Sequence, residues 1–556
     1  MLKPPFRPIA QLLGKVRDRW PRPVRYALGI SCSQALLAVP AIAAEQIYLN
    51  YSVLERAIPI EDLETYAREG TLSDDLRAYA RYFSAEQLEA FQSSLLVEAD
   101  LGVVPISQFL YTPQGEALLT ELGKVIRTGA RQPGFSAIRA AVILAAADDE
   151  GLTLLNVLKK FPTPAIRVDL RRSAQLAREV FDEINQTDAA IALLQNQAQL
   201  AIQNDPAAGE ASIFDWVSLG AEGPYAWERI PLNPAIADFP ADLYLPQIRQ
   251  AAPIVVLSHG LGGDRTTLAY LARHLASHGF AVAVVEHPGS SAEQITNLLA
   301  GRANQVIAPE ELVQRPLEIQ TLLDSLERQA AADPLLAARL NFQQVGILGQ
   351  SLGAYTTLAI AGAAINRPQL ESSCPPSFDS LNVSLLLQCL ALQLPAQTPD
   401  LADERIKAAI AINPLGSAIF GKAGYRQIEI PLMLVSGSSD TVTPALAEQI
   451  RPFTWLMKPQ RYLLLMQGGT HFSTLDDAVE GEGAIPVPET VIGPDPALAK
   501  RYMQAISLAF FKTYLAGESA YRPFLTPAYV SLLSRNALPL SLVESLTPEQ
   551  LAQVEQ

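Results

Sequence analysis

The stretch Gly349-Gln350-Ser351-Leu352-Gly353 constrains the fold of this 556-residue chain more than any other. It follows the apolar run Val345–Leu348, which we expect to be a buried strand, and it precedes Ala354–Ala361, which we expect to be a helix. Glycines around a serine at such a turn permit a strained backbone that neighbouring Cβ atoms would obstruct. The pattern is typical of a serine nucleophile presented on a sharp strand-to-helix turn. The alternative is an ordinary turn in which Ser351 caps the helix.

A nucleophilic serine needs a base to remove its proton and an acid to orient that base. On a strand–turn–helix scaffold these partners follow the serine in the order acid, then histidine. The histidines are His259, His274, His278, His287 and His471, and only His471 follows Ser351. It ends the segment Arg461–His471, an apolar strand with a glycine turn, so we expect it at the carboxyl end of a strand, where open α/β sheets bind ligands.

Asp440 is the candidate acid. The carboxylates between Ser351 and His471 are Glu371, Asp379, Asp400, Asp403, Glu404, Glu429, Asp440 and Glu448. Only Asp440 directly follows a strand-like run, Pro431–Gly437, and Thr441–Pro444 then turns toward a helix. Glu429 precedes that strand and is expected at the opposite end of the sheet. The alternative for Asp440 is a turn or helix-capping aspartate.

Acyl transfer also requires backbone N–H groups directed at the developing oxyanion. We assign one to Leu352, the residue after the nucleophile, and the other to Leu261. Leu261 lies in the glycine-rich loop 258–263, which follows the predicted strand 253–257. For His259, in the same loop, we favour a structural role.

The sequence gives no indication of a metal or a cofactor. The histidines and the three cysteines lack metal-ligand spacing, and Gly260–Gly263 lacks the Lys-Ser/Thr pair of a nucleotide-binding loop. We expect His274 and His278 to be surface or satisfied polar residues of the next helix. The net charge of −15 argues against nucleic acid as a partner.

Several segments resemble a known family. Ser258–Gly262, His274–Phe280 and Val284–His287 resemble the plasma-type (isoform II) platelet-activating factor acetylhydrolases and their bacterial relatives, and Asp440–Pro444 looks like the polyester-hydrolase and cutinase branch of the same superfamily. The resemblance covers about residues 212–515. It implies an α/β-hydrolase fold, a mostly parallel sheet with helices on both faces, and a cofactor-free ester hydrolase. The matching positions are Ser351, Asp440 and His471, with Leu261 and Leu352 at the oxyanion hole.

Two segments depart from the acetylhydrolase pattern. Residues 366–403 look like an insertion, and residues 45–205 resemble a helical domain of unknown function found ahead of some bacterial hydrolases. Acyl-chain and alcohol specificity therefore stay open.

We expect three regions after the N-terminal segment. Residues 45–205 form a mainly helical domain, with helices near 84–96, 114–126, 135–147, 151–160 and 170–203 and a strand pair at 47–60 and 166–170. Residues 206–516 form the catalytic domain, because strands and helices alternate there from a first strand near 214–219. Residues 517–556 form a peripheral tail of short helices or a partly mobile segment.

Residues 1–44 are predicted to be a secretory signal. They carry a net charge of +6, followed by the apolar stretch Tyr26–Ala43 and the small-residue pattern Ala41-Ile42-Ala43. The alternatives are an uncleaved membrane anchor or a buried helix; a lipoprotein signal at Cys32 is less well supported. We expect a periplasmic or secreted protein.

In an exported chain, Cys374 and Cys389 are expected to form a disulfide, with unpaired thiols as the alternative. The strongly apolar segment 381–395 beside them is interpreted as a lid or acyl-pocket wall, or as a helix docked on the N-terminal domain.

These observations predict a serine carboxylic ester hydrolase that acts on a small-molecule or lipid ester. An acyltransferase, in which a bound alcohol replaces water, and a polyester or cutinase-like hydrolase use the same site, as do a peptidase and a thioesterase. The alternative of another class is a non-enzymatic binding protein that uses the helical module. Contact with a membrane surface, a protein partner of residues 45–205 and the oligomeric state are left open.

Overall fold

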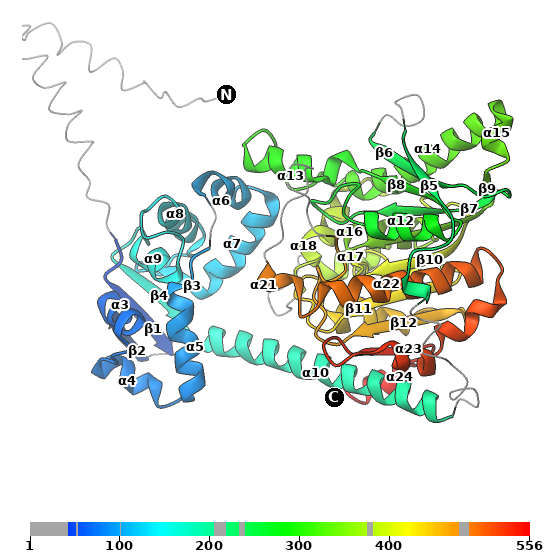
Figure 1. Ribbon diagram of the computed structural model, residues 1–556. Helices are drawn as coiled ribbons and strands as arrows, with labels where there is room; N and C mark the ends of the chain where they lie inside the picture. Colours follow the sequence, from blue (N-terminus) through cyan, green and yellow to red (C-terminus); the bar gives the residue numbers. More distant parts are fainter. Residues whose placement is uncertain are drawn as a thin grey trace, which may run out of the picture. The chain divides into compact units, whose positions relative to one another are not determined.

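The computed structural model describes residues 43–51, 54–99, 102–204, 218–232, 239–374, 382–476 and 489–555. The chain divides into two compact units (Figure 1). The smaller contains the described residues up to 99 together with Leu122–Leu170, and the larger contains Gly102–Glu121 and the described residues from Arg171 onward. The predicted signal, residues 1–44, lies almost entirely outside the described residues, as does the chain from 205 to 217 that follows the predicted domain boundary.

The smaller unit combines helices with a sheet. Its described strands have the order β2-β1-β4-β3, in which β1 pairs with β4 in parallel and the other pairs are antiparallel. A capping box at Ser84 opens α5, where the Ser84 and Gln87 side chains each accept from the other's backbone N–H. The elements are β1 (Gln46–Tyr51), β2 (Leu54–Pro59), α3 (Ile60–Glu69), α4 (Asp74–Ala80), α5 (Ala85–Leu96), β3 (Ile126–Thr128), α8 (Phe135–Ala146), α9 (Leu154–Lys159) and β4 (Ala165–Asp169).

The helical segment that interrupts the smaller unit in sequence and the helix that follows it belong to the larger unit. These are α6 (Val103–Leu110), the first part of α7 (Pro113–Val125) and nearly all of α10 (Leu170–Gln203). The α10 side chains Ala190, Leu194 and Ala198 are buried in the core that includes the large sheet. The predicted boundary at residue 205 therefore differs from the division of the folded chain, because α10 buries its apolar stripe in the larger unit.

The larger unit is built on a mixed sheet whose nine described strands have the order β13-β12-β11-β10-β9-β7-β8-β6-β5. The six strands from β12 to β8 are parallel, and β13, β6 and β5 join antiparallel at the edges. Their bounds are β5 (Trp227–Pro231), β6 (Ala241–Pro246), β7 (Ala252–Ser258), β8 (Ala281–Val285), β9 (Leu340–Gln350), β10 (Ile406–Ile412), β11 (Leu432–Gly437), β12 (Arg461–Met466) and β13 (Leu540–Val543). This confirms the predicted α/β-hydrolase fold.

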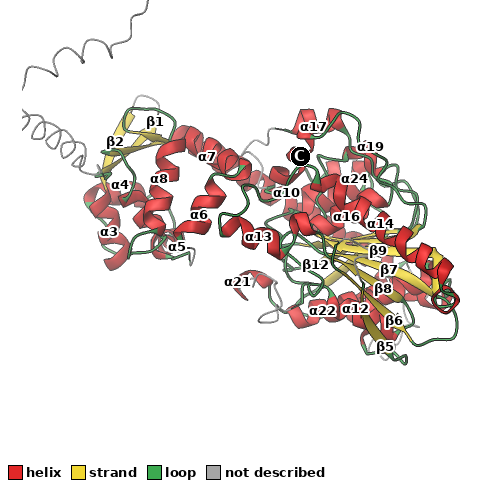
Figure 2. Cartoon of the chain, turned by 90° about the horizontal axis from the view of Figure 1, so that it is seen from above, coloured by secondary structure: helices red, strands yellow, loops and turns green. Residues whose placement is uncertain are grey.

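Helices cover both faces of this sheet, as Figure 2 shows. One core holds α14 (Glu311–Ala332) and α16 (Leu352–Ile360), and the other holds α12 (Ala269–Ser277) and α22 (Pro496–Tyr514). The central strands are buried on both faces, which explains their nearly continuous apolar sequences. Shorter elements are η1 (Pro288–Ser290), α13 (Ala292–Leu299), α15 (Pro334–Ala337), α17 (Arg367–Ser373), α18 (Leu385–Gln388), η2 (Cys389–Gln393), α19 (Gly421–Tyr425), the π-helix η3 (Leu446–Ile450), α20 (Arg451–Phe453) and α21 (Glu489–Ile492).

Two predictions of local structure need correction. The strand expected near 214–219 falls mostly outside the described residues, and its described end, Ser218–Gly220, is helical. The chain after residue 516 is not merely peripheral, because β13 pairs with β12 and Leu538, Leu542 and Leu546 are buried. Its other elements are η4 (Ser519–Leu525), α23 (Pro527–Leu533) and α24 (Pro548–Ala552).

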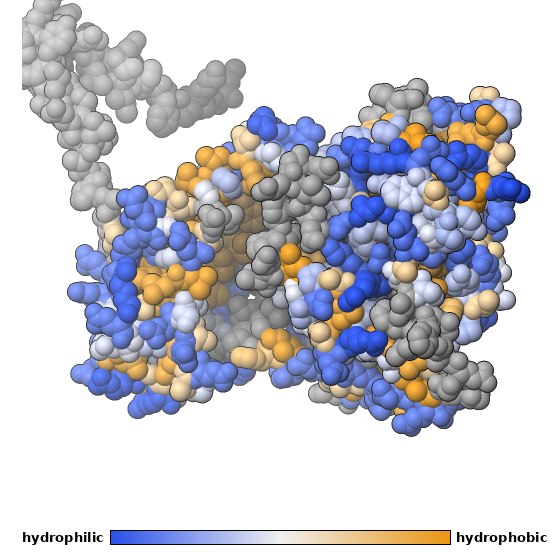
Figure 3. All heavy atoms as spheres, viewed as in Figure 1, coloured by the Kyte–Doolittle hydropathy of each residue, from blue (hydrophilic) through white to orange (hydrophobic). Residues whose placement is uncertain are grey.

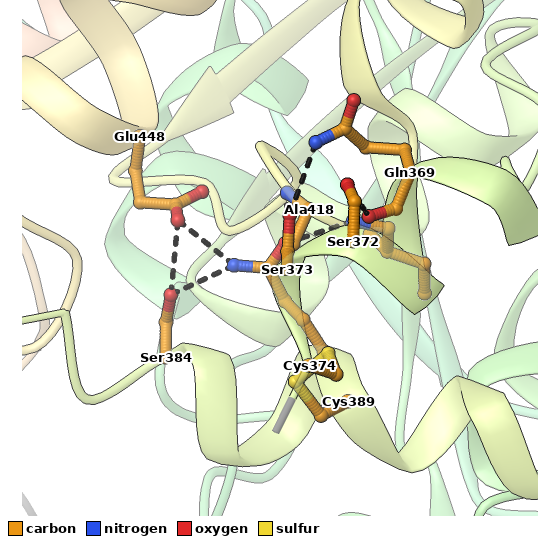
Figure 4. The surroundings of a disulfide bond; sticks show 10 residues. Gln369, Ser372, Ser373, Cys374, Ser384, Cys389, Ala418 and Glu448 are labelled. Atoms are coloured by element: carbon orange, nitrogen blue, oxygen red, sulfur yellow. Dashed lines mark hydrogen bonds between the residues drawn. A yellow bond between two sulfur atoms is a disulfide. The ribbon is translucent and has the colours of Figure 1, made fainter. Parts of the chain in front are cut away.

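The described part of the insertion is fixed to the sheet's helical layer (Figure 4). Cys374 and Cys389 form a disulfide with their Cα atoms 5.7 Å apart. Beside it, the fully buried Glu448 of η3 accepts hydrogen bonds from Gln388 Nε2 at 2.8 Å, Ser384 Oγ at 3.3 Å and the Asn382 amide. Segment 382–394 is therefore anchored at a buried carboxylate as well as by a covalent bond.

Hydrophobic side chains are also exposed on the molecular surface. On the face drawn in Figure 3, orange patches lie among blue over the smaller unit and over α6 and α7, whereas the rest of the larger unit is mostly blue. Exposed large apolar residues of the smaller unit include Tyr82, Phe83 and Val97. Within the described ranges, no helix combines the length and apolar character needed to cross a bilayer.

Removing the disulfide should destabilise the larger unit. The bond joins residues 15 apart. Closing a loop of that length stabilises a protein by about 3 kcal/mol in the chain-entropy model. We expect the double variant Cys374→Ala, Cys389→Ala to lose about that much unfolding free energy in a urea titration. Reductant should shift the wild-type curve and leave that of the double variant unchanged; equal shifts in both would contradict the prediction.

Candidate active site

Ser351 occupies the sharp turn between β9 and α16. Its backbone has φ 56° and ψ −118°, a conformation that a side-chain-bearing residue rarely adopts. A Cβ on Gly349 would lie 2.1 Å from the Gly353 carbonyl oxygen, and one on Gly353 would lie 2.0 Å from the Ser258 carbonyl oxygen. The two flanking glycines are therefore required by close backbone packing of the turn against itself and against the end of β7.

The structure brings Ser351, His471 and Asp440 together in one chain of hydrogen bonds. Ser351 Oγ is 2.8 Å from His471 Nε2, and His471 Nδ1 is 2.7 Å from Asp440 Oδ2. The three residues follow the parallel strands β9, β12 and β11 of one sheet, in which β10 separates β9 from β11, so their loops meet at the carboxyl edge of the sheet. All three side chains are buried.

The Asp440 carboxylate is held by the turn that follows it. Its Oδ1 accepts from the N–H groups of Val442 at 2.8 Å and Thr443 at 2.7 Å, and its Oδ2 accepts from Thr443 Oγ1 at 2.9 Å. These donors hold the carboxylate in place and fix the oxygen that faces His471. Asp440 thus accepts hydrogen bonds within its own turn, as expected for the alternative of a turn or helix-capping aspartate, and it also contacts the imidazole of His471.

The loop after β7 lies beside the nucleophile. A Cβ on Gly260 would be 3.2 Å from Ser351 Cβ and 2.4 Å from Gln350 Oε1, so a side chain at this position would force neighbouring atoms to shift. In the described part of the chain, no protein group accepts a hydrogen bond from the N–H of Leu261 or Leu352. Among the described residues, therefore, neither of the backbone N–H groups that we predicted for the oxyanion hole has a protein acceptor.

A buried polar network supports this loop from below. His259 Nδ1 donates to the Gly260 carbonyl at 2.6 Å, and His259 Nε2 accepts from the His287 N–H at 3.0 Å. His287 Nε2 accepts from Ser258 Oγ at 2.9 Å, while its Nδ1 contacts Glu318 at 2.5 Å. Arg315, which has no exposed surface, donates to Ser258 Oγ and to the His259 carbonyl. His259 thus has a structural position below the loop.

Burial keeps these histidine side chains neutral by lowering their pKa. Burial, with the Arg315 cation nearby, lowers the pKa of His259 to about 3 and the pKa of His287 well below its ordinary value. Burial also lowers the pKa of His274, on α12, to about 3. Burial lowers the pKa of Arg315 to about 10, which leaves it a cation at neutral pH. His274 is thus buried, whereas the ring of the more exposed His278 contacts the Ala221 carbonyl.

Three supporting residues were not singled out from the sequence. Gln350 and Asn413 donate side-chain hydrogen bonds to the carbonyl of His471, and Thr443 joins Asp440 to the Asn413 carbonyl. A polar residue directly after an apolar strand was the available signal at Asn413, the same signal that selected Asp440. No three His, Cys, Asp or Glu side chains of the described ranges are grouped so as to hold a metal ion.

Two family models match parts of the chain. Residues 43–169 match the model described as an alpha/beta hydrolase of unknown function (DUF1400), and residues 243–327 match the platelet-activating factor acetylhydrolase, isoform II, model. The second match covers most of β6, all of β7 and β8, the loop that follows β7, and most of α14.

Curated relatives include several bacterial cutinases. The chain is 21% identical over 287 residues to cutinase 2 of Thermobifida cellulosilytica, an alignment that covers 51% of this chain and 77% of that protein. It is also 21% identical over 287 residues to cutinase cut1 of Thermobifida fusca, covering 51% of this chain and 63% of the relative. The predicted resemblance to acetylhydrolases and bacterial esterases is confirmed.

Acid should destabilise the fold through its buried histidines. Their pKa is lower in the folded protein than in the unfolded chain, so below about pH 6.5 the unfolded chain binds protons that the folded protein excludes. Above that pH both states are neutral and the effect vanishes. We expect urea titrations between about pH 7.5 and pH 5 to show an unfolding free energy that is nearly constant above about pH 6.5 and falls below that pH by up to about 1.4 kcal/mol per pH unit for each such histidine.

The His274→Leu variant provides the matched comparison, because His274 lies on α12 outside the triad and its supporting network. It should show the same trend with the proton uptake of one histidine removed. An unfolding free energy that is flat across this pH range, or a slope unaltered by His274→Leu, would contradict the assignment.

Proposed function

We propose that this chain, an α/β hydrolase related to the platelet-activating factor acetylhydrolases and bacterial esterases, is a serine carboxylic ester hydrolase with Ser351, His471 and Asp440 as its catalytic triad. The observation that carries the proposal is the continuous contact from Ser351 Oγ through the imidazole of His471 to the carboxylate of Asp440, at 2.8 and 2.7 Å. Such geometry converts a weak hydroxyl nucleophile into an effective one.

In the acylation half-reaction, Ser351 Oγ attacks the ester carbonyl carbon while His471 Nε2 takes the hydroxyl proton. The carbonyl oxygen becomes an oxyanion, which the N–H groups of Leu261 and Leu352 stabilise. Asp440 holds the imidazole by its Nδ1–H and stabilises the imidazolium. His471 then gives its proton to the leaving alkoxide, the ester C–O bond breaks, and an acyl-serine and a free alcohol result.

Deacylation repeats these steps with water. His471 Nε2 removes a proton from the water as its oxygen attacks the acyl carbon, and the same two N–H groups bind the oxyanion. The Ser351 oxygen leaves and takes the proton back from His471. The products are a carboxylic acid and the regenerated serine, so the cycle uses no group from outside this chain except ester and water.

The substrate we favour is a lipid or small carboxylic ester. The match of residues 243–327 to the acetylhydrolase model supports this class. That segment includes the loop 258–263, which carries Leu261 beside Ser351 and is called the oxyanion loop below. A second candidate is a polyester, which the similarity to cutinases favours. We also propose that the enzyme works outside the cytoplasm, since a structural disulfide such as Cys374–Cys389 persists in oxidising compartments.

One prediction of the proposed function concerns the triad. Ser351→Ala, His471→Ala and Asp440→Asn should each lower kcat by roughly 10³- to 10⁵-fold, because each breaks the proton-transfer chain. A fluorophosphonate probe should label the wild type at one site, identified by mass spectrometry as Ser351, and should not label Ser351→Ala.

Matched controls separate the site from its surroundings. Ser372→Ala, on the exposed end of α17, and His278→Gln, on the far end of α12, should keep wild-type labelling and kcat. A correctly folded wild type that neither labels nor hydrolyses any ester would reject the proposal and favour the binding-protein alternative.

The second prediction concerns substrate choice. Turnover of p-nitrophenyl esters from acetyl to palmitoyl, an ether phospholipid with a short sn-2 acyl group, and a polyester film should rank the candidates. We expect kcat/KM to be highest for the soluble or lipid esters. Release of soluble products from the film at a higher rate than from every soluble ester would instead identify the cutinase-like alternative.

A further inference from the structure

Asn413 has the backbone conformation and burial of a residue with a special task. It follows β10 directly, precedes Pro414, has φ 46° and is only 2% exposed. Left-handed backbone is unfavourable for a residue with a side chain and before a proline, so surrounding contacts must hold it. Strand β10 lies between β9, which carries the nucleophile, and β11, which carries the acid.

The side-chain amide of Asn413 joins two loops. One is the acid loop, which follows β11 and carries Asp440, and the other is the histidine loop, which follows β12 and carries His471. Its Oδ1 accepts from the Gly437 N–H at 3.0 Å. Its Nδ2 donates to the carbonyls of Thr470 at 3.2 Å and His471 at 3.3 Å. The Asn413 backbone adds a third connection, because its carbonyl lies 3.2 Å from Thr443 Oγ1, whose one proton is shared between this carbonyl and Asp440 Oδ2.

A second amide reaches the same carbonyl from the other side. Gln350, the residue before the nucleophile, donates from Nε2 to the His471 carbonyl at 2.9 Å. Its Oε1 lies against Gly260, since a Cβ at that glycine would be only 2.4 Å away. Gln350 therefore bonds the histidine loop and packs against the loop after β7, whereas Asn413 bonds both the histidine loop and the acid loop.

The histidine loop requires such restraints. His471 follows Gly468, which has φ 78°, and Gly469, so the segment leading to the imidazole has few side chains of its own to pack. An imidazole in a triad must be held within about 0.5 Å of its productive position. A ring is placed by the backbone that carries it, and here the carbonyl of that backbone is the shared acceptor of two buried amides.

We propose that Asn413 and Gln350 form an amide clamp on the His471 carbonyl and are positioning residues of the triad. The inference rests on the hydrolase function proposed above. The clamp fixes the main chain of His471 so that Nδ1 faces Asp440 while Nε2 faces Ser351, and neither amide touches the reacting atoms.

The variants are chosen to keep the backbone unstrained. Asn413→Gly removes the amide while tolerating the left-handed φ, and Asn413→Asp keeps the shape while replacing the NH₂ donor with an oxygen facing two carbonyls. Gln350→Glu makes the same donor exchange on the other side. Asn341→Asp, at the opposite end of the sheet beside Gln344, is the matched control for an amide-to-acid change.

Each clamp variant should lower kcat by about 10- to 100-fold, because a displacement of about 1 Å at the base costs on that order. KM should change by less than about 3-fold, since substrate contacts are untouched. Fluorophosphonate should still label close to one site per chain, only more slowly. Asn341→Asp should behave as wild type.

The double variant Asn413→Gly, Gln350→Glu tests whether the two amides act as one unit. Its loss in kcat should be smaller than the product of the two single losses, because both act through one carbonyl. A loss equal to the product would overturn the shared clamp.

Two further outcomes would also overturn the positioning role. One is unchanged kcat in Asn413→Gly. The other is activity that falls only in proportion to the labelled fraction, with normal turnover per labelled site, since that result means a stability defect. Failure of wild-type protein to label would instead reject the hydrolase function itself, so the two failures are distinguishable.

Discussion

The contact between the nucleophile turn and the loop after β7 is the constraint on which the site depends. These segments follow neighbouring parallel strands, and they meet where Gly353 packs on the Ser258 carbonyl and Gly260 packs on Ser351. Any side chain at those glycines would separate the serine from the loop that carries Leu261. One close approach of two backbones therefore sets both the strained serine and the space available to an oxyanion.

Different groups support the two sides of this contact. The acid side holds a carboxylate bonded by donors from its own turn, whereas the loop side is supported by two neutral imidazoles, the buried cation Arg315 and the carboxylate of Glu318. Both neutral rings use one nitrogen as donor and the other as acceptor, so a proton added to either would break a bond it now accepts. The support below the oxyanion loop is thus built for neutral pH.

The parts of this architecture that are local in sequence were predictable. Buried parallel strands are continuous apolar runs, and Ser351, Asp440 and His471 each lie in the turn or loop that follows one, so the fold and the three meeting residues followed from pattern and order. Asn413 follows a strand too, but its importance depends on β10 lying between two other strands and on hydrogen bonds to backbone carbonyls, which leave no trace in residue type. Strand β13 was missed because four residues among prolines give no periodic signal, and its pairing with β12 joins positions about 75 residues apart in sequence.

The anchoring of segment 382–394 bears on how ester reaches the serine. A swinging lid exchanges its packed position for an open one, so its contacts must be weak or exposed. Here Glu448 is fully buried and accepts from Gln388 and Ser384 of this segment, from Ser417 Oγ and from the N–H groups of Gly416 and Ser417. Withdrawing the segment would leave a buried carboxylate short of donors, which costs several kcal/mol. The Ser384 N–H also bonds the Val442 carbonyl in the acid loop, so such movement would disturb the turn that holds Asp440. These contacts favour a fixed segment over a moving lid, and the bond to Val442 links the position of that segment to the turn that holds Asp440.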